Sequence, residues 1–220
     1  MLAATVHLLR HGEVHNPDKV LYGRLPGFHL SELGRTMAER AAEYFAAQRR
    51  AGANIVHLAA SPLTRAQETA GPTAKALSLD IETDERLIEA ENHFEGLSGV
   101  KNQLRHPRHW RYLTNPLRPS WGEPYRAQVE RMMDAVGDHR DRAVALGGPG
   151  AQAVLVSHQL PIWVTRLAAE NKHLWHDPRR RQCTLASVTS LDFEGERLVA
   201  VRYTEPCADL LANAANIPGA

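Results

Sequence analysis

The sequence predicts an α/β protein: a three-layer sandwich with a mostly parallel central sheet flanked by helices and one antiparallel hairpin at the sheet edge. Two observations predict it. An apolar strand, a turn and a helix follow one another three times along the chain, and strands that alternate with helices favour parallel pairing. Near the C-terminus, two further apolar runs flank Glu194-Gly195-Glu196, which is typical of a hairpin. With 220 residues, the chain suits one large α/β domain or two small ones.

The first predicted strand, Thr5–Leu9, is short, rich in β-branched and aliphatic residues, and followed by Arg10, His11 and Gly12. Ligands bind just past the carboxyl ends of parallel strands. This Arg-His-Gly motif therefore places a cation and an imidazole capable of nucleophilic attack where a ligand would bind. The glycine is expected to let the backbone turn tightly or approach a ligand closely.

Predicted helices follow the first two strands. After a loop, Ser31 is the expected N-cap of a helix whose apolar residues recur at helical spacing as far as Phe45. The second strand, Ile55–Ala59, is followed by Ser61 as the expected N-cap and by Pro62 as the first helical residue. Ser61 is a poor nucleophile candidate, because no Gly-x-Ser-x-Gly elbow surrounds it.

The third strand, Ala153–Val156, leads through His158 into another helix. Residues 126–146 carry apolar side chains at helical spacing and are expected to form a covering helix. The edge hairpin is expected from Leu185–Phe193 and Leu198–Tyr203.

Composition narrows the function. Lys plus Arg is 26 and Asp plus Glu is 25, a balance that argues against a general nucleic-acid binder. Cys183 and Cys207 form neither a metal-type spacing nor a disulfide framework, which favours a reducing cytosolic setting. No apolar stretch approaches the length of a membrane span, and the first strand begins too early to leave room for a signal peptide. A cytoplasmic protein with no membrane partner is therefore expected.

The predicted strands end in polar residues of one kind. Arg10, His11, Arg65 and His158 all follow strand ends, so they are expected to converge at one side of the sheet, where they would suit a tetrahedral dianion such as phosphate. Arg65 also lies in the first turn of its helix, where the macrodipole disfavours a cation unless an anion binds there. The alternatives are a solvated Arg65 partly offset by Glu68, and a buried structural His158.

Four blocks of sequence make this pattern specific. They are LLRHGEVHNP, YGRLPGFHLSELGRTMA, SPLTRAQETA and LVSHQLP. In their order and spacing, over about residues 4–205, they resemble the histidine phosphatase superfamily, in its phosphoglycerate-mutase-like branch. The resemblance implies a single catalytic domain over residues 1–205, with a lid-type insertion at about 96–122, followed by a C-terminal tail at 206–220 that its composition predicts to be loose.

The resemblance also implies roles. His11 would be the nucleophile and become phosphohistidine, while Arg10, Arg65 and His158 would hold the phosphoryl oxygens. Physical reasons support this, because neighbouring cations lower the pKa of an imidazole and favour its neutral, nucleophilic form. The same cations stabilise charge on the transferring group, so neither a metal nor a cofactor is expected. His158 is expected to be more useful protonated, sharing charge with the phosphate.

Four further residues are predicted to contact phosphate or substrate: Asn16, Gly23, Arg24 and Gln159. Asn16 matches a family position that donates to the phosphate, although its loop is about one residue shorter here. Gln159 stands where many relatives have glycine. Its backbone N–H is retained, but its side chain is expected to narrow the site and so to affect substrate size.

A phosphomonoester also needs its leaving oxygen protonated. The family uses a carboxylate after a Leu-x-Glu pattern, which Leu87 and Glu89 match here. Glu89 would act as general acid and then as base for the water that cleaves phosphohistidine. Its spacing to Glu95 is one residue shorter than the common pattern, so Glu91 is the second choice; a solvated loop carboxylate is the alternative for Glu91.

The insertion at 96–122 contains no acidic residue. The resemblance implies that it lies over the site as a lid, where its charge would suit a second anionic group on the substrate, with help from Arg24. A solvated basic loop is the alternative. Its cationic and aromatic residues are Lys101, Arg105, His106, Arg108, His109, Trp110, Arg111, Tyr112, Arg118 and Trp121.

The histidine pairs in the sequence do not indicate a metal site. His11 with His15, and His173 with His176, have ligand-like spacings, but no acidic or cysteine partners accompany them. No metal site is therefore expected from the sequence.

The leading hypothesis is a phosphomonoester hydrolase that acts through phosphohistidine on a small anionic phosphorylated metabolite. One alternative is a cofactor-dependent phosphoglycerate mutase, but the adjacent Arg pair in the lid of true mutases is missing from 96–122. Another is a non-catalytic phosphate-binding module, against which His11 and Glu89 argue. The expected partner is the small substrate alone, and the oligomeric state stays open, a homodimer included.

Overall fold

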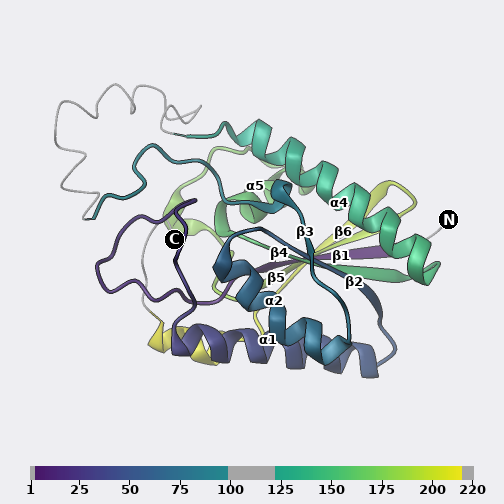
Figure 1. Cartoon of the computed structure of the whole chain (residues 1–220). Helices are drawn as coiled ribbons and strands as arrows, with labels where there is room; N and C mark the ends of the chain where they lie inside the picture. Colours follow the sequence, from purple (N-terminus) through teal and green to yellow (C-terminus); the bar gives the residue numbers. More distant parts are fainter. Residues whose placement is uncertain (1–2, 99–121, 215–220) are drawn as a thin grey trace.

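A computed structural model describes residues 3–98 and 122–214 (Figure 1). Six strands form one mixed sheet in the order β3-β2-β4-β1-β5-β6. The pairs β1–β4, β2–β4 and β2–β3 are parallel, whereas β5 is antiparallel to β1 and β6 is antiparallel to β5. The strands are β1 (Ala3–Arg10), β2 (Asn54–Ala60), β3 (Glu82–Thr83), β4 (Ala151–Ser157), β5 (Val188–Glu194) and β6 (Arg197–Thr204).

Helices cover both faces of this sheet, which makes three layers. In Figure 1, α1 and α2 lie on one side and α4 and α5 on the other. The described helices are α1 (Glu32–Arg50), α2 (Thr64–Leu77), α4 (Tyr125–Gly147) and α5 (Gln159–Ala169), with short 3₁₀ turns η1 (Glu85–Leu87), η3 (Pro178–Arg180) and η4 (Ala208–Asn213).

The alternation of apolar side chains along β1 explains the layers. Successive side chains of a strand point to opposite faces. Val6 and Leu8 belong to the core cluster that contains Met132 of α4, and Leu9 belongs to the cluster that contains Phe45 of α1. The predicted fold class is confirmed, including the antiparallel hairpin at the edge.

The register of the strands aligns the carboxyl ends of β1, β2 and β4. Arg10 pairs with Ser157 across β1 and β4, and Ala60 of β2 lies opposite Val156. The three strands therefore end at nearly one level, and the next residues are held there by the backbone. The N–H of His11 donates to the carbonyl oxygen of Ser157 at 3.1 Å, and that of Ser61 donates to Val156 at 2.9 Å.

The two predicted helix caps differ in outcome. Ser31 caps α1 as predicted, because its Oγ accepts the N–H of Gly34 at 2.9 Å. The prediction for Ser61 was wrong: α2 begins at Thr64, after Leu63, and Leu63 provides no side-chain cap. The hydroxyl of Ser61 bonds His158 instead, at 2.7 Å.

The glycine of the Arg-His-Gly motif serves the packing of α1. A Cβ built on Gly12 would lie 2.6 Å from the carbonyl oxygen of Gly34, and one on Gly34 would lie 2.0 Å from that of Glu13. Two backbone segments thus touch where only glycine fits. The close approach that was expected towards a ligand is made towards helix α1.

Residues beyond 205 were expected to be loose, but the part of the tail that is described is packed. Cys207 belongs to a hydrophobic cluster that includes Met37 of α1, and Ala214 packs against that cluster. Short strand β3 and the 3₁₀ turns carry no sequence pattern of their own and were not predicted. The predicted lid at 96–122 lies almost wholly outside the described residues. No helix within 3–98 and 122–214 has the length and apolarity needed to cross a membrane.

Candidate active site

Five predicted residues form one buried cluster at the carboxyl ends of the strands: Arg10, His11, Arg65, Glu89 and His158. Each is at most 8% exposed. His11 and His158 follow β1 and β4, and their ring centroids lie 5.1 Å apart. Arg65 comes from the first turn of α2, and Glu89 follows η1. A cluster of this many buried ionisable side chains indicates a candidate functional site.

Backbone geometry selects the nucleophilic nitrogen of His11. Its Nδ1 lies 2.8 Å from the carbonyl oxygen of Gly12. A carbonyl only accepts, so Nδ1 carries the proton and Nε2 carries the lone pair. Within the described part of the chain Nε2 has no hydrogen-bond partner.

The charge state of His11 follows from its surroundings. Burial lowers the pKa of His11 well below its usual range, and the positive charges of Arg65 and Arg10 lower it further. The Gly12 carbonyl acts in the opposite direction and does not cancel these effects. The imidazole is therefore neutral at pH 7, as a nucleophile must be.

The two guanidinium groups are tethered to backbone carbonyls. Arg10 donates to Cys183 at 2.7 Å, and Arg65 donates to Gly23 at 2.6 Å. Arg65 also lies 4.7 Å above the ring of Tyr22, a cation–π contact. Both cations are thus preorganised beside the imidazole of His11.

Gly23 was predicted to touch phosphate or substrate, and it lies where it positions Arg65. Its φ is +38°, and a Cβ there would come within 2.2 Å of Oε1 of Glu95. Only glycine fits this backbone conformation beside Glu95 without strain, and the carbonyl so placed holds Arg65.

His158 is bonded to Ser61 through Nε2. Burial, and next the charge of Arg65, lower the pKa of His158 well below its usual range. Without phosphate in the site, His158 is therefore neutral, whereas the protonated form was expected beside bound phosphate. A dianion bound beside it would raise that pKa again.

Glu89 is the carboxyl group of the cluster. Burial raises the pKa of Glu89, against the opposing effects of the Ala90 N–H, which donates to it at 2.8 Å, and of Arg65 and Arg10. A raised pKa favours the protonated form, in which a carboxyl group can act as an acid. Glu91 is exposed, and its backbone carbonyl accepts the N–H of Glu123. The structure therefore places Glu89, not Glu91, where it interacts with Arg65 and Arg10.

Two other predicted contact residues are occupied with the protein itself. The side-chain amide of Asn16 donates to the carbonyl of Val20 and accepts its N–H, at 2.8 and 3.0 Å. The guanidinium of Arg24 donates to the carbonyl of Glu89 and to the carboxylate of Glu123, at 2.7 and 3.0 Å. Arg24 is therefore partly neutralised and supports the loop that carries Glu89.

The side chain of Gln159 contacts Arg181, a cation that the sequence analysis did not predict to be in the site. Its Nε2 donates to the carbonyl of Cys183 at 3.3 Å, and its Oε1 accepts from Arg181 at 3.4 Å. Arg181 also donates to Nε2 of His176 at 2.9 Å. Burial lowers the pKa of Arg181, and the charge of Glu89 opposes this, which places the guanidinium near the general-acid candidate.

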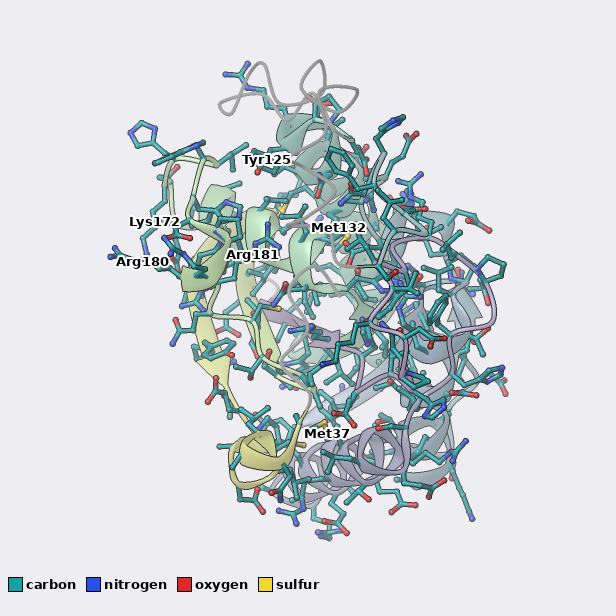
Figure 2. All side chains as sticks on the ribbon, turned by 90° about the vertical axis from the view of Figure 1, so that its left-hand side faces the viewer. Met37, Tyr125, Met132, Lys172, Arg180 and Arg181 are labelled. Atoms are coloured by element: carbon teal, nitrogen blue, oxygen red, sulfur yellow. The ribbon has the colours of Figure 1, made fainter. Side chains whose placement is uncertain are left out.

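Arg181 is the last of three consecutive arginines, and no pattern in the sequence separates it from the other two. Arg179 and Arg180 are exposed, whereas Arg181 is half-buried. In Figure 2, Arg180 lies at the outer edge of the view and Arg181 lies nearer its middle. Three residues of one type thus have different surroundings, which only the fold reveals.

The arrangement matches the needs of phosphoryl transfer. A neutral imidazole offers a lone pair, fixed cations flank it, and a carboxyl group with a raised pKa lies close enough to interact with both arginines. Positive groups placed in advance around a developing negative charge are usually the largest contribution to catalysis.

Comparison with known proteins agrees with this chemistry. The model of the histidine phosphatase superfamily (branch 1) matches residues 6–206. The uncharacterized protein Rv0525 of Mycobacterium tuberculosis is 52% identical over 205 residues, which cover 92% of this chain and 96% of that protein.

Solved structures extend the comparison. The mycobacterial glucosyl-3-phosphoglycerate phosphatase Rv2419c is similar with a TM-score of 0.72 and 26% identity, covering 91% of this chain and 97% of that one. A phosphoglycerate mutase from Bacillus anthracis has a TM-score of 0.66 at 18% identity, covering 90% and 92% of the two chains, a likeness of fold alone.

Proposed function

Because this chain belongs to branch 1 of the histidine phosphatase superfamily, we propose that it is a phosphomonoester hydrolase that acts through a phosphohistidine intermediate. One observation carries the proposal: the buried Nε2 of His11 keeps its lone pair beside Arg10 and Arg65. Both cysteines are buried free thiols, in keeping with work in the reducing cytoplasm.

The first step transfers the phosphoryl group to the protein. Nε2 of His11 attacks phosphorus, the bond from phosphorus to the leaving oxygen breaks, and Glu89 donates its proton to that oxygen. Arg10, Arg65 and His158 hold the phosphoryl oxygens as their charge rises. The N–H at Nδ1 stays bonded to the Gly12 carbonyl, which helps to carry the positive charge that forms on the ring.

The second step returns His11 to its starting state. Glu89, now a carboxylate, takes a proton from a water molecule whose oxygen attacks phosphorus. The bond between phosphorus and Nε2 breaks, inorganic phosphate leaves, and Glu89 is again protonated. No redox partner or further cofactor is needed for the balance.

The substrate is a small metabolite with a second anionic group beside its phosphate, and Arg181 binds that group. In support, the two side chains that accept hydrogen bonds from Arg181, those of His176 and Gln159, are neutral. No carboxylate of the described residues pairs with Arg181 at ion-pair distance, whereas Glu123 partly neutralises Arg24. The similarity to a glucosyl-3-phosphoglycerate phosphatase favours a phosphorylated, acidic metabolite of this kind.

The direct test is hydrolysis of p-nitrophenyl phosphate in the presence of a chelator. We expect His11→Ala to lose at least ~10³-fold in kcat, because no other group attacks phosphorus. His15→Ala is the matched control, since His15 is an exposed histidine of the same loop, and its activity should equal that of the unaltered protein. Rapid-quench labelling should trap phosphohistidine only when His11 is present. Equal turnover with and without His11 would overturn the proposal.

A phosphoglycerate mutase would share the first step but return the phosphoryl group to its substrate, for which it must exclude water. Interconversion of 2- and 3-phosphoglycerate, assayed with and without a bisphosphoglycerate primer, separates the two activities. We expect release of inorganic phosphate from some members of a panel of phosphorylated metabolites, glucosyl-3-phosphoglycerate included, and no primed interconversion. Phosphate binding without labelling of His11 would instead indicate a binding module.

A further inference from the structure

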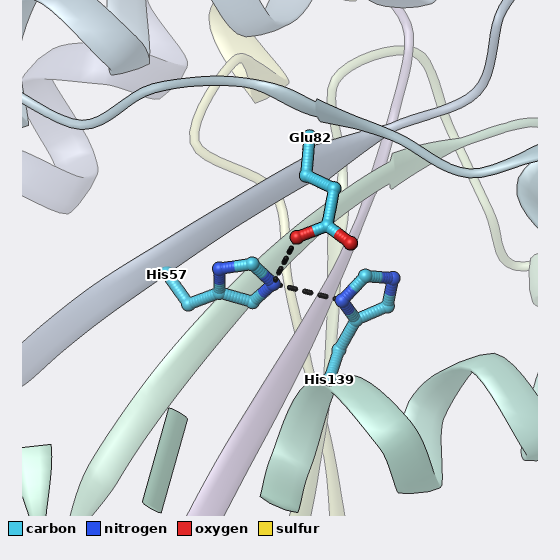
Figure 3. A group of neighbouring side chains, drawn as sticks. All are labelled: His57, Glu82 and His139. Atoms are coloured by element: carbon cyan, nitrogen blue, oxygen red, sulfur yellow. Dashed lines mark hydrogen bonds and ion pairs between the residues drawn. The ribbon is translucent and has the colours of Figure 1, made fainter. Parts of the chain in front are cut away.

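A second cluster of titratable side chains lies outside the phosphoryl-transfer site. His57 of β2, Glu82 of β3 and His139 of α4 point towards one another (Figure 3), and one ligand atom from each lies within 4.8 Å of the other two. His57 and His139 are buried, whereas the Glu82 side chain is 37% exposed. Within the described ranges, this is the one group of three such ligands.

We propose that His57, Glu82 and His139 bind a divalent transition-metal ion, Zn²⁺ foremost, which ties the sheet edge to helix α4. Two imidazole nitrogens and one carboxylate oxygen are ligands that zinc prefers, and a water molecule commonly completes such a set. The proposal is independent of the phosphatase activity, because none of the three residues belongs to that site.

Distances between the donor atoms fit a small ion. Zinc bonds of about 2.0–2.2 Å in a tetrahedral arrangement put donors roughly 3.4 Å apart. Nε2 of His57 lies 2.8 Å from Nδ1 of His139 and 3.8 Å from Oε2 of Glu82, values on either side of that separation. The third pair, His139 and Glu82, lies within 4.8 Å, so small side-chain adjustments would bring all three donors to that separation.

Asp84 prepares His139 as a ligand. Its carboxylate accepts a hydrogen bond from Nε2 of His139 at 2.9 Å, so Nε2 carries the proton and Nδ1 directs its lone pair at His57. Zinc-bound histidines almost always donate their other ring nitrogen in this way. Arg86 holds Asp84 in place through three hydrogen bonds of 2.8–3.1 Å.

The backbone also aims His57 at this cluster. The pairing of β2 with β4 shifts register between Ile55 and His57. Such irregularities redirect a side chain from its usual place on a regular strand. Because β3 contains only two residues, its attachment to the sheet is slight, and an ion that bridges Glu82 to α4 would strengthen it.

A hydrogen-bond relay is the competing explanation. The N–H at Nε2 of His57 can donate to Nδ1 of His139, which satisfies both rings without an ion. Binding zinc would require the His57 proton to occupy Nδ1 instead, an exchange of tautomers with no change of charge. Arg142 competes too, since it lies 3.2 Å from Oε2 of Glu82.

The experiment uses the full-length protein without a histidine tag, treated with a chelator and then freed of it. Calorimetric titration with Zn²⁺, the absorption spectrum with Co²⁺, and the thermal midpoint with and without Zn²⁺ are measured. We expect one ion per chain, a tetrahedral cobalt spectrum, and a midpoint raised by the metal. His57→Ala and Glu82→Gln should each weaken binding at least tenfold.

Control variants separate the site from casual binding. His29→Ala removes a surface histidine paired with Glu68 and should leave zinc binding unchanged. Arg142→Ala frees Glu82 and should tighten binding, and Asp84→Asn should weaken it about 10–100-fold. Absence of binding, or binding that His57→Ala and Glu82→Gln both leave intact, would overturn the proposal and leave the relay as the explanation. If His57→Ala fails to fold, the half-exposed Glu82→Gln still decides between them.

Discussion

In the proposed mechanism, the carbonyl oxygen of Gly12 determines which nitrogen of His11 attacks phosphorus. By holding the proton at Nδ1, it leaves the lone pair at Nε2 without any need for a neighbouring base. Arg65 and Arg10 add to burial in keeping the ring neutral. In that mechanism, His11 is activated by one hydrogen bond and by the charges around it, and not by a relay of side chains.

Substitution of Glu89 tests which carboxyl group is the general acid. We expect Glu89→Gln to lower kcat by roughly 10²–10⁴-fold for an alkyl phosphate, because the poor leaving oxygen must be protonated. The loss should be smaller for p-nitrophenyl phosphate, whose leaving group departs without help. Glu91→Gln, at an exposed position, is the control and should retain full activity. The reverse ranking of the two variants would assign the role to Glu91.

Arg181 is expected to govern substrate recognition. Arg181→Ala should raise KM about tenfold or more for a substrate with a second anionic group, because it removes a charge-assisted contact. It should change KM for p-nitrophenyl phosphate, which lacks that group, much less. Arg180→Ala tests the exposed neighbour and should have no effect on either substrate. An equal rise in KM for both substrates would contradict this assignment.

At the scale of elements, alanine substitutions at two glycines are expected to change the stability of the protein in opposite directions. Gly34→Ala should destabilise the protein by more than about 2 kcal/mol and lower activity, since the new Cβ would collide with the backbone that follows His11. Gly137→Ala, inside α4, should stabilise it by ~0.5–1 kcal/mol, because among the described residues nothing beyond the helix's own backbone lies within 4 Å of the new Cβ. Urea unfolding of the two variants measures both effects. A stable and active Gly34→Ala variant would contradict the prediction, because it would show that the backbone contact with α1 can accommodate a Cβ.

The elements also show how far sequence reasoning reaches. Strands β1, β2 and β4 were predictable because each buried strand is a short apolar run that stops at polar residues, and parallel pairing then brings Arg10, Arg65 and His158 together. The role of Ser61 was mistaken, because a serine before a helix is usually a cap and its partner His158 is 97 residues away. Arg181, His57 and Glu82 carry no local pattern; only the path of the chain reveals their neighbours.

At the scale of the whole molecule, buried histidines make stability depend on pH. Burial is the main cause of the lowered pKa values of His7, His11 and His158. Below pH 6.5 these rings bind protons in the unfolded chain but stay neutral in the folded protein. The free energy of unfolding therefore falls as the pH falls towards their folded pKa values. Glu89 acts in the opposite direction, because its pKa is raised and the folded protein gains stability from it at lower pH.

We therefore expect the free energy of unfolding to be lower at pH 5.5 than at pH 7 by an amount on the order of a few kcal/mol, since each ring contributes up to ~1.4 kcal/mol per pH unit and Glu89 opposes them. Urea titrations in phosphate-free buffer measure this difference. His158→Gln should reduce the difference, whereas His15→Gln, at an exposed position, should not. A free energy that stays constant between these pH values would contradict neutral burial of the three rings.

The order of strands in the sheet has a consequence for how the protein is made. Strand β1 leaves the ribosome first, yet its two neighbours are β4 at 151–157 and β5 at 188–194. At about 5–20 residues per second, the apolar side chains of β1 wait on the order of 10 s for a partner. During that interval Val6, Leu8 and Leu9 have no sheet to join. We therefore expect β1 to rely on chaperones or on provisional contacts until β4 and β5 have emerged.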